Sequence, residues 1–206
     1  MTGASASACI PVPTRDQIGG LVLAGGRGLR MGGVDKGLAA WRGEPLVSHV
    51  LRRLRPQVAQ VGISANRNFE AYRALAPVIA DPDPTAFAGP LTGVLAALRT
   101  VQTDWLVVVP CDLPLLPADA VARLAAALGA HAATHAAYAA PTGQTHSLVC
   151  LLHRSLAPAL ERFVANGGQR VRAAYLALGA LAVPFADAQA FINLNATSDL
   201  QAADPQ

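Results

Sequence analysis

Short apolar runs alternate with amphipathic stretches along most of the chain. Nearly continuous apolar runs predict buried strands at 18–24, 59–64, 77–80, 105–109, 136–140, 148–152 and 181–185. Apolar positions at helical spacing predict helices near 45–54, 69–75, 91–99, 117–128, 155–165 and 170–178, with a last helix after residue 195. Because strands and helices alternate without a repeat or a linker, we expect an α/β fold, a three-layer sandwich with a mainly parallel sheet.

The composition is that of one globular domain, with 52% hydrophobic and 14% charged residues among 206. We assign residues 18–206 to this domain and residues 1–17 to a flexible N-terminal tail, which has no signal-peptide pattern. No apolar run is long enough to cross a membrane, and the three cysteines form no C-x-x-C pair, so we expect a cytoplasmic protein. The net charge of +3 favours a small polyanionic ligand over nucleic acid.

The segment LAGGRGLRMGGVDKGL, residues 23–38, directly follows the first predicted strand. A dinucleotide fingerprint fails because Met31 stands where the third glycine belongs, which disfavours a redox enzyme. A P-loop fails because Val34 and Asp35 stand where lysine and serine or threonine belong. The glycines still allow backbone N–H groups to approach phosphate oxygens, and Arg30 and Lys36 can neutralise their charge.

Lys36 is the only lysine among the 16 basic residues of the chain. An ammonium on a slim stem is not interchangeable with a planar guanidinium, so its place in the glycine-rich segment indicates a function.

Polar residues follow several of the predicted strands. Ser64 and Asn66 follow the second strand, Asp81 ends the third, and Asp112 comes just after the run at 105–109. The carboxyl ends of parallel strands meet at one edge of a sheet, where ligands bind, so one site is implied. Asp112 is a natural oxygen ligand for Mg²⁺, or alternatively the cap of the next helix, although two prolines delay that helix.

The same segments carry a family resemblance. Residues 23–38 closely resemble the signature loop of the molybdenum cofactor guanylyltransferases, nucleotidyltransferases with a Rossmann-like fold. The likeness continues in EPLVSHV, SANR, VIAD, GPLTGVL, VPCDLP, THSLV, QRV and FINLN, and spans about residues 20–200. It implies transfer of GMP from GTP to the terminal phosphate of molybdopterin, with Mg²⁺ required and pyrophosphate released.

The resemblance also implies roles for individual residues. Nucleotide contacts fall on Leu23, Ala24, Gly25, Lys36, Asn66, Asp81 and Asp112. Asp112 would also bind the metal, and catalysis would rest on Lys36, Arg30 and Asp112. Molybdopterin contacts fall on His146, Arg170, Asn193 and Asn195. Ser64 stands where the family often has asparagine, which leaves open whether Ser64 or Asn66 contacts the nucleotide.

Other functions fit the sequence less well. A cytidylyltransferase on the same cofactor usually has Ala-Ala-Gly where this chain has Ala24-Gly25-Gly26, and a sugar-phosphate nucleotidyltransferase is a further alternative. A non-catalytic nucleotide-binding or cofactor-carrier protein would not need both Lys36 and Asp112. We expect a monomer whose substrates are GTP and molybdopterin, with a molybdenum insertion protein or molybdoenzyme chaperones as possible partners.

Overall fold

A seven-stranded sheet forms the centre of the molecule. The computed structural model describes residues 11–24, 35–80, 89–131, 133–143 and 148–194. The sheet has the order β5-β4-β1-β6-β8-β7-β9. Its strands are β1 (Ile18–Leu23), β4 (Gln60–Ser64), β5 (Val78–Ile79), β6 (Trp105–Pro110), β7 (Ala136–Pro141), β8 (Cys150–His153) and β9 (Leu181–Phe185). Only the pairings of β8 with β6 and β7 are antiparallel, which confirms the expected mainly parallel sheet.

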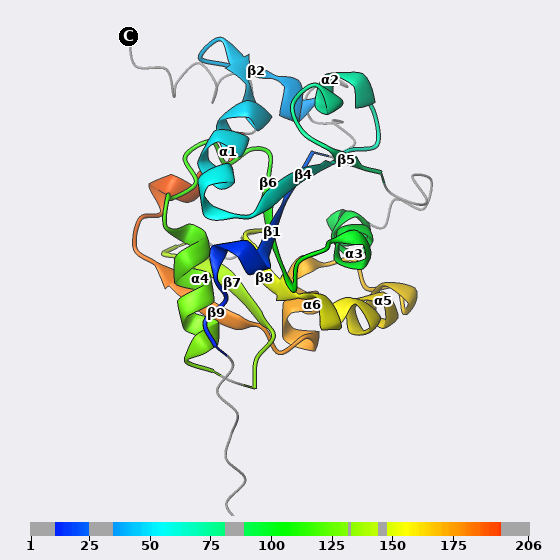
Figure 1. The fold of residues 1–206 in the computed structure, drawn as a ribbon, viewed down its shortest axis with the longest axis vertical. Helices are drawn as coiled ribbons and strands as arrows, with labels where there is room; N and C mark the ends of the chain where they lie inside the picture. Colours follow the sequence, from blue (N-terminus) through cyan, green and yellow to red (C-terminus); the bar gives the residue numbers. More distant parts are fainter. Residues whose placement is uncertain (1–10, 25–34, 81–88, 132, 144–147, 195–206) are drawn as a thin grey trace, which may run out of the picture.

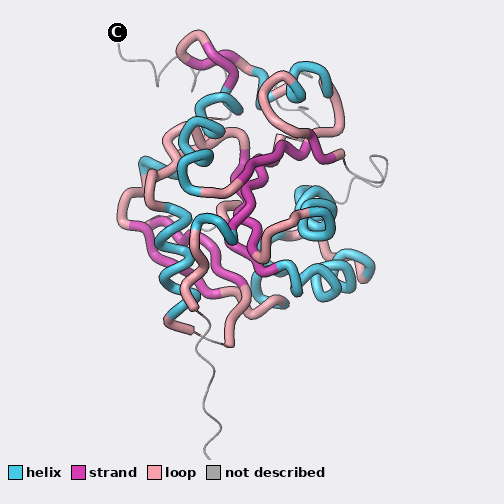
Figure 2. Tube along the Cα trace, viewed as in Figure 1, coloured by secondary structure: helices cyan, strands magenta, loops and turns pink. Residues whose placement is uncertain are grey.

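Helices cover both faces of this sheet (Figures 1 and 2). On one face lie α1 (Leu46–Leu54) and α4 (Ala120–Gly129), whose apolar side chains form one core together with Tyr72 of α2 (Phe69–Arg73). On the other face lie α3 (Pro90–Thr100), α5 (Ala157–Ala165) and α6 (Val171–Ala177), which form a second core. The two cores confirm the three-layer sandwich.

The central strand β1 shows why these apolar runs become strands. Its alternate side chains enter different cores, so that Leu21 packs with α3 while Val22 packs with α1. Both are fully buried, as expected of a strand covered by helices on both faces. Gly20 lets α1 approach closely, because a Cβ there would lie 3.1 Å from the Leu54 side chain. This packing fixes the carboxyl end of β1 against its neighbours.

The boundaries differ from the expected ones in a few places. Helix α4 begins at Ala120 and not at residue 117, since Pro117 lies in a turn whose carbonyl accepts a hydrogen bond from the Ala120 amide. A small hairpin, β2 (Ala40–Trp41) and β3 (Glu44–Pro45), was not expected and turns through Arg42 and Gly43 at positive φ. The remaining short helices are η1 (Arg15–Gln17), η3 (Lys36–Leu38), η4 (Arg55–Gln57), η5 (Arg154–Leu156) and η6 (Gln189–Phe191). The helix expected after residue 195 lies outside the described residues.

Part of the segment assigned to the tail is packed on the domain. Pro13 is buried, η1 follows it, and Arg15 Nε donates a hydrogen bond to the Pro56 carbonyl. Among the described residues, no helix is long and apolar enough to cross a membrane.

Candidate active site

An ion pair joins the segment after β1 to the segment after β6. Lys36 opens η3, and its Nζ contacts Oδ2 of Asp112, which lies 76 positions further along the chain. The side chains are 24% and 14% exposed, respectively, so both are mostly buried. The sequence placed both residues at the carboxyl edge of the sheet, and the structure brings their side chains together there.

Asp112 is held in place by its backbone. The Cys111 amide donates to the Leu23 carbonyl at 3.0 Å, which continues the pairing of β1 and β6 beyond the strands. The Asp112 carbonyl accepts from the Leu194 amide at 3.1 Å. Helix α4 begins only at Ala120, so Asp112 does not cap it. The cap of α4 is Asp119, and the metal-ligand role of Asp112 stays a prediction.

The second oxygen of the Asp112 carboxylate has no hydrogen-bond partner among the described residues. Oδ1 is buried and accepts no hydrogen bond from any described residue, although burial of an unpaired carboxylate oxygen is costly. A hard cation or a ligand donor would satisfy it. No three potential metal-ligating side chains cluster within the described parts of the chain. A buried carboxylate oxygen of this kind suits Mg²⁺, which commonly uses one or two carboxylates and takes its other ligands from phosphates and water.

The ends of β1 and β4 form the adjoining wall. Leu23 pairs with Ser64, and the Ala24 amide donates to the Ser64 carbonyl at 2.8 Å. The Ser64 side chain is directed at α3, since a Cβ on Gly93 would lie 2.5 Å from its Oγ. Ser64 thus takes part in the contact between helix and sheet, while the half-buried Asn66 lies in the loop that follows. Of the two candidates, the geometry leaves Asn66 nearer to solvent.

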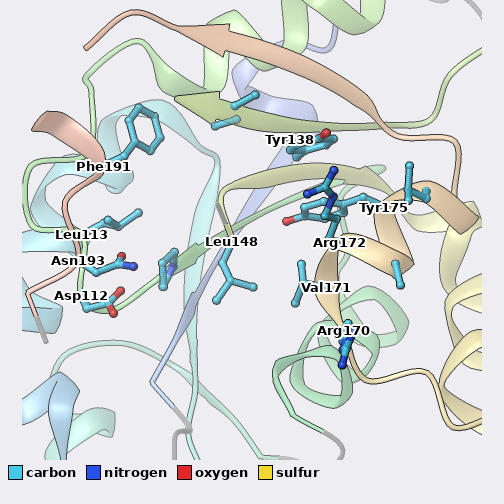
Figure 3. Close-up of a pocket in the computed structure, with 15 residues that line it drawn as sticks. Asp112, Leu113, Tyr138, Leu148, Arg170, Val171, Arg172, Tyr175, Phe191 and Asn193 are labelled. Carbon is cyan, nitrogen blue, oxygen red and sulfur yellow. The ribbon is translucent and has the colours of Figure 1, made fainter. Parts of the chain in front are cut away.

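A cavity of about 930 Å³ opens beside Asp112 (Figure 3). It is lined by residues from the end of β6, from β7, from α6 and from 191–193, among them Asp112, Tyr138, Arg170, Arg172, Tyr175 and Asn193. Asp112 and Asn193 lie at one end of the cavity, and Tyr138, Arg172 and Tyr175 lie at the other (Figure 3). Arg170 is exposed at the start of α6. The structure thus brings Arg170 and Asn193, both predicted, to the same cavity as Asp112.

Tyrosines form part of the far wall of this cavity. Tyr138 stacks on Tyr175 with ring centroids 4.5 Å apart and planes 13° from parallel. Burial raises the pKa of Tyr175 well above its usual range, and the neighbouring Cys150 acts in the same direction. Burial likewise raises the pKa of Cys150 to about 12. These groups stay uncharged, so this wall offers flat aromatic surface with the charge supplied by arginine.

Sequence reasoning missed Tyr138 and Arg172 as cavity residues. Arg172 carries no signal in the sequence, because residues two apart do not share a face of a helix. Tyr138 carries none either, because nothing in an apolar strand marks which face borders a cavity. Five predicted residues, Gly25, Arg30, Asp81, His146 and Asn195, lie outside the described residues.

Solved structures of other proteins have a fold similar to that of this chain. Molybdopterin-guanine dinucleotide biosynthesis protein A from Archaeoglobus fulgidus superposes with a TM-score of 0.72 at 23% identity, covering 90% of this chain and 96% of that one. 4-Diphosphocytidyl-2C-methyl-D-erythritol synthase from Anaerococcus prevotii superposes with a TM-score of 0.70 at 11% identity, covering 91% and 94%. These likenesses show that the chain shares the fold of both proteins.

Sequence comparison shows that the chain is a nucleotidyltransferase and identifies its family. The chain belongs to the MobA-like NTP transferase domain family, whose model matches residues 20–180. A molybdenum cofactor guanylyltransferase of Ralstonia nicotianae is 43% identical over 199 residues, covering 92% of this chain and 97% of that protein. One of Cupriavidus metallidurans is 44% identical over 192 residues, covering 91% and 94%.

Proposed function

We propose that this chain transfers GMP from GTP to the terminal phosphate of molybdopterin and releases pyrophosphate. The observation that carries the proposal is the position of Asp112. It pairs with Lys36 on the side of β1, and it lines the cavity beside α6. One carboxylate thus borders both a phosphate-binding segment and a space for a second substrate. The relatives named molybdenum cofactor guanylyltransferase supply the identity of the two substrates.

The reaction makes and breaks one bond at phosphorus. A terminal phosphate oxygen of molybdopterin attacks the α-phosphorus of GTP, and the bond from that phosphorus to the bridging β-phosphate oxygen breaks. Pyrophosphate leaves with the electron pair. Because a phosphate monoester has a second pKa of roughly 6, the attacking oxygen is already largely ionised and needs no catalytic base. The protein has to align two polyanions and neutralise the charge that grows on the leaving group.

Lys36 is the described residue best placed to neutralise that charge. Its Nζ is held at the carboxyl edge of the sheet by Asp112, and Arg30 of the glycine-rich segment is proposed to assist it. The backbone at Leu23, Ala24 and Gly25 and the Asn66 side chain would bind the nucleotide. Asp81 would accept from the N1–H and the amino group of guanine.

Asp112 would also hold Mg²⁺. The unpaired Oδ1 is the atom available for it, while Oδ2 is shared with Lys36. When bound, the ion would supply positive charge to the phosphates of the nucleotide. We propose the Mg²⁺ requirement from the donor chemistry of this oxygen.

The cavity suits the acceptor. Arg170 and Asn193 line it, and we propose that they bind molybdopterin together with His146 and Asn195. The aromatic wall formed by Tyr138 and Tyr175 suits a fused ring system, because flat rings stack well on aromatic side chains. The acceptor phosphate would then lie toward Asp112.

Transfer assays with three nucleotides test the proposal against its rivals. Purified protein is incubated with molybdopterin, MgCl₂ and GTP, CTP or ATP, with the dinucleotide product measured by mass spectrometry and pyrophosphate measured by a coupled assay. We expect product from GTP, with a strong preference over CTP and ATP. Equal use of CTP would support a cytidylyltransferase. Nucleotide binding without pyrophosphate release would support a non-catalytic carrier.

A further inference from the structure

A buried carboxylate lies directly before the only lysine of the chain. Asp35 is 7% exposed, and both of its carboxylate oxygens have partners. Oδ1 accepts from the Gly37 amide at 3.2 Å and from the Tyr72 hydroxyl. Oδ2 accepts from Asn68 Nδ2 at 2.9 Å and lies 3.4 Å from Arg67 Nε. Three hydrogen-bond donors and one guanidinium therefore converge on a side chain to which the sequence assigned no role.

Three of these four groups come from a different part of the sheet edge. Arg67, Asn68 and Tyr72 belong to the loop after β4 and to α2, whereas Asp35 belongs to the segment after β1. Tyr72 is fully buried, and burial together with the Asp35 carboxylate raises the pKa of its phenol far above the usual range. The phenol thus stays protonated and donates. Asp35 ties the segment that carries Lys36 to the core of the domain.

The residue after Lys36 is fixed by the same contact. A Cβ on Gly37 would lie 2.4 Å from the Tyr72 hydroxyl oxygen, so only glycine allows this close approach. Helix η3 is a single turn of three residues and could not hold a side chain in place by itself. The residues on both sides of Lys36, Asp35 and Gly37, are thus held by contacts with Tyr72. From this position the Lys36 ammonium contacts Asp112.

We infer that Asp35 is a positioning residue, which fixes the backbone of Lys36 so that the ammonium meets Asp112 and the phosphates of the nucleotide. The inference rests on the proposed function for the role of the phosphates. It goes beyond that function because it gives a role to the contacts among Asp35, Gly37 and Tyr72. A small displacement of a reacting or charge-neutralising group can lower the rate of a transfer by as much as ~10²-fold. The alternative is that Asp35 only stabilises the fold.

Because Lys36 is the only lysine, the conformation of its side chain can be observed directly. When the protein is labelled with carbon-13 lysine, its NMR spectrum contains the signals of Lys36 alone. A side chain held in one conformation has two distinct ε-proton shifts, and free rotation averages them. We expect two shifts in the wild type, and their collapse in the Asp35→Asn and Tyr72→Phe variants. Tyr72→Phe removes only one donor, so it keeps the test usable if Asp35→Asn fails to fold.

A control separates positioning from stability. Leu128→Ala removes a fully buried side chain at the end of α4, and it should lower the melting temperature without altering the Lys36 signals. Unchanged ε-proton shifts in a folded Asp35→Asn or Tyr72→Phe protein would overturn the inference. This measurement needs no turnover, so it stands apart from success or failure of the transfer assay.

Kinetics supply the second readout. Asp35→Asn should lower kcat by roughly 10- to 100-fold with a smaller change in the KM for GTP. In a Lys36→Ala background the same change should cost about twofold or less, because its effect acts through Lys36. Additive losses in the double variant would show that Asp35 acts elsewhere and would overturn the inference.

Discussion

The two halves of the sheet contribute to the site in different ways. The first half, β5, β4, β1 and β6, is parallel and presents charged groups joined by an ion pair and hydrogen bonds. The second half, β8, β7 and β9 with α6, contains the antiparallel pairings and borders a cavity that is lined by tyrosines and arginines. The first half holds charged side chains in fixed positions, and the second half lines a cavity.

The difference follows from what each substrate needs. A triphosphate needs positive charge and backbone donors at fixed places, and those are available where parallel strands end. A larger acceptor needs contact area, which comes from side chains spread over a strand and a helix. Substitutions in the first half should therefore change the rate of transfer, and substitutions in the second half should change the affinity for the acceptor.

The largest effect is expected at Asp112, which borders both halves. Asp112→Asn keeps the shape of the side chain but removes the charge that a divalent ion requires, so turnover should fall on the order of 10³-fold. The melting temperature should change little, because Oδ1 already lacks a partner among the described residues. Turnover is measured against Mg²⁺ concentration. The matched control is Asp119→Asn, an exposed acid at the start of α4 that makes no capping hydrogen bond through its side chain. An active Asp112→Asn enzyme with unchanged Mg²⁺ dependence would contradict the metal-ligand proposal.

The next largest effect is expected at Lys36. Lys36→Ala should lower turnover by ~10²-fold or more, since one preorganised charge is lost. Stability should hardly change, because the Lys36 side chain belongs to neither hydrophobic core of the sandwich. Arg99→Ala serves as the control, since it removes an exposed cation that pairs with Glu161 on α5. A Lys36→Ala rate near that of the wild type would refute the assignment.

A substitution of Arg170 tests whether the second half of the sheet binds the acceptor. Arg170→Ala should raise the KM for molybdopterin by about 10-fold, the scale of one charge-assisted hydrogen bond, and leave the KM for GTP unchanged. Arg162→Ala on α5 is the control, because Arg162 is exposed and does not line the cavity. Steady-state kinetics with each substrate varied in turn would measure both constants. An equal rise in the two KM values would remove the distinction between the halves.

The smallest effect concerns the buried thiols, one in each half. Burial, with the Asp112 carboxylate beside it, raises the pKa of Cys111 above its usual range, and burial raises that of Cys150 to about 12. Both should react slowly with thiol reagents in a Cys9→Ser background. Cys150 should react a few-fold faster, because the short helix α6 that covers it has only two buried residues and opens more easily. Labelling followed by peptide mass spectrometry measures the two rates, and faster labelling of Cys111 would reverse this order of local stability.

The first half was largely predictable from the sequence. Its strands are mostly apolar runs whose carboxyl ends lie along one edge, so Lys36 and Asp112 were expected at that same edge. The second half was not, because the strands at 136–140 and 148–152 are apolar whichever neighbours they pair with. The antiparallel placement of β8, and hence the cavity face of Tyr138, depends on tertiary packing. The hydrogen bonds of Asp35 could not be predicted for the same reason, since Asn68 and Tyr72 lie 33 and 37 positions away along the chain.

The attachment of the second half bears on how such enzymes diverge. Strand β8 joins the second half to the first through its pairing with β6, and the strands and helices of the second half come from one continuous stretch of chain, residues 120–191. Mutations in that stretch can reshape the cavity while Lys36 and the ends of β1 and β4 stay in place. A lineage with this architecture can acquire a new acceptor and keep its nucleotide chemistry.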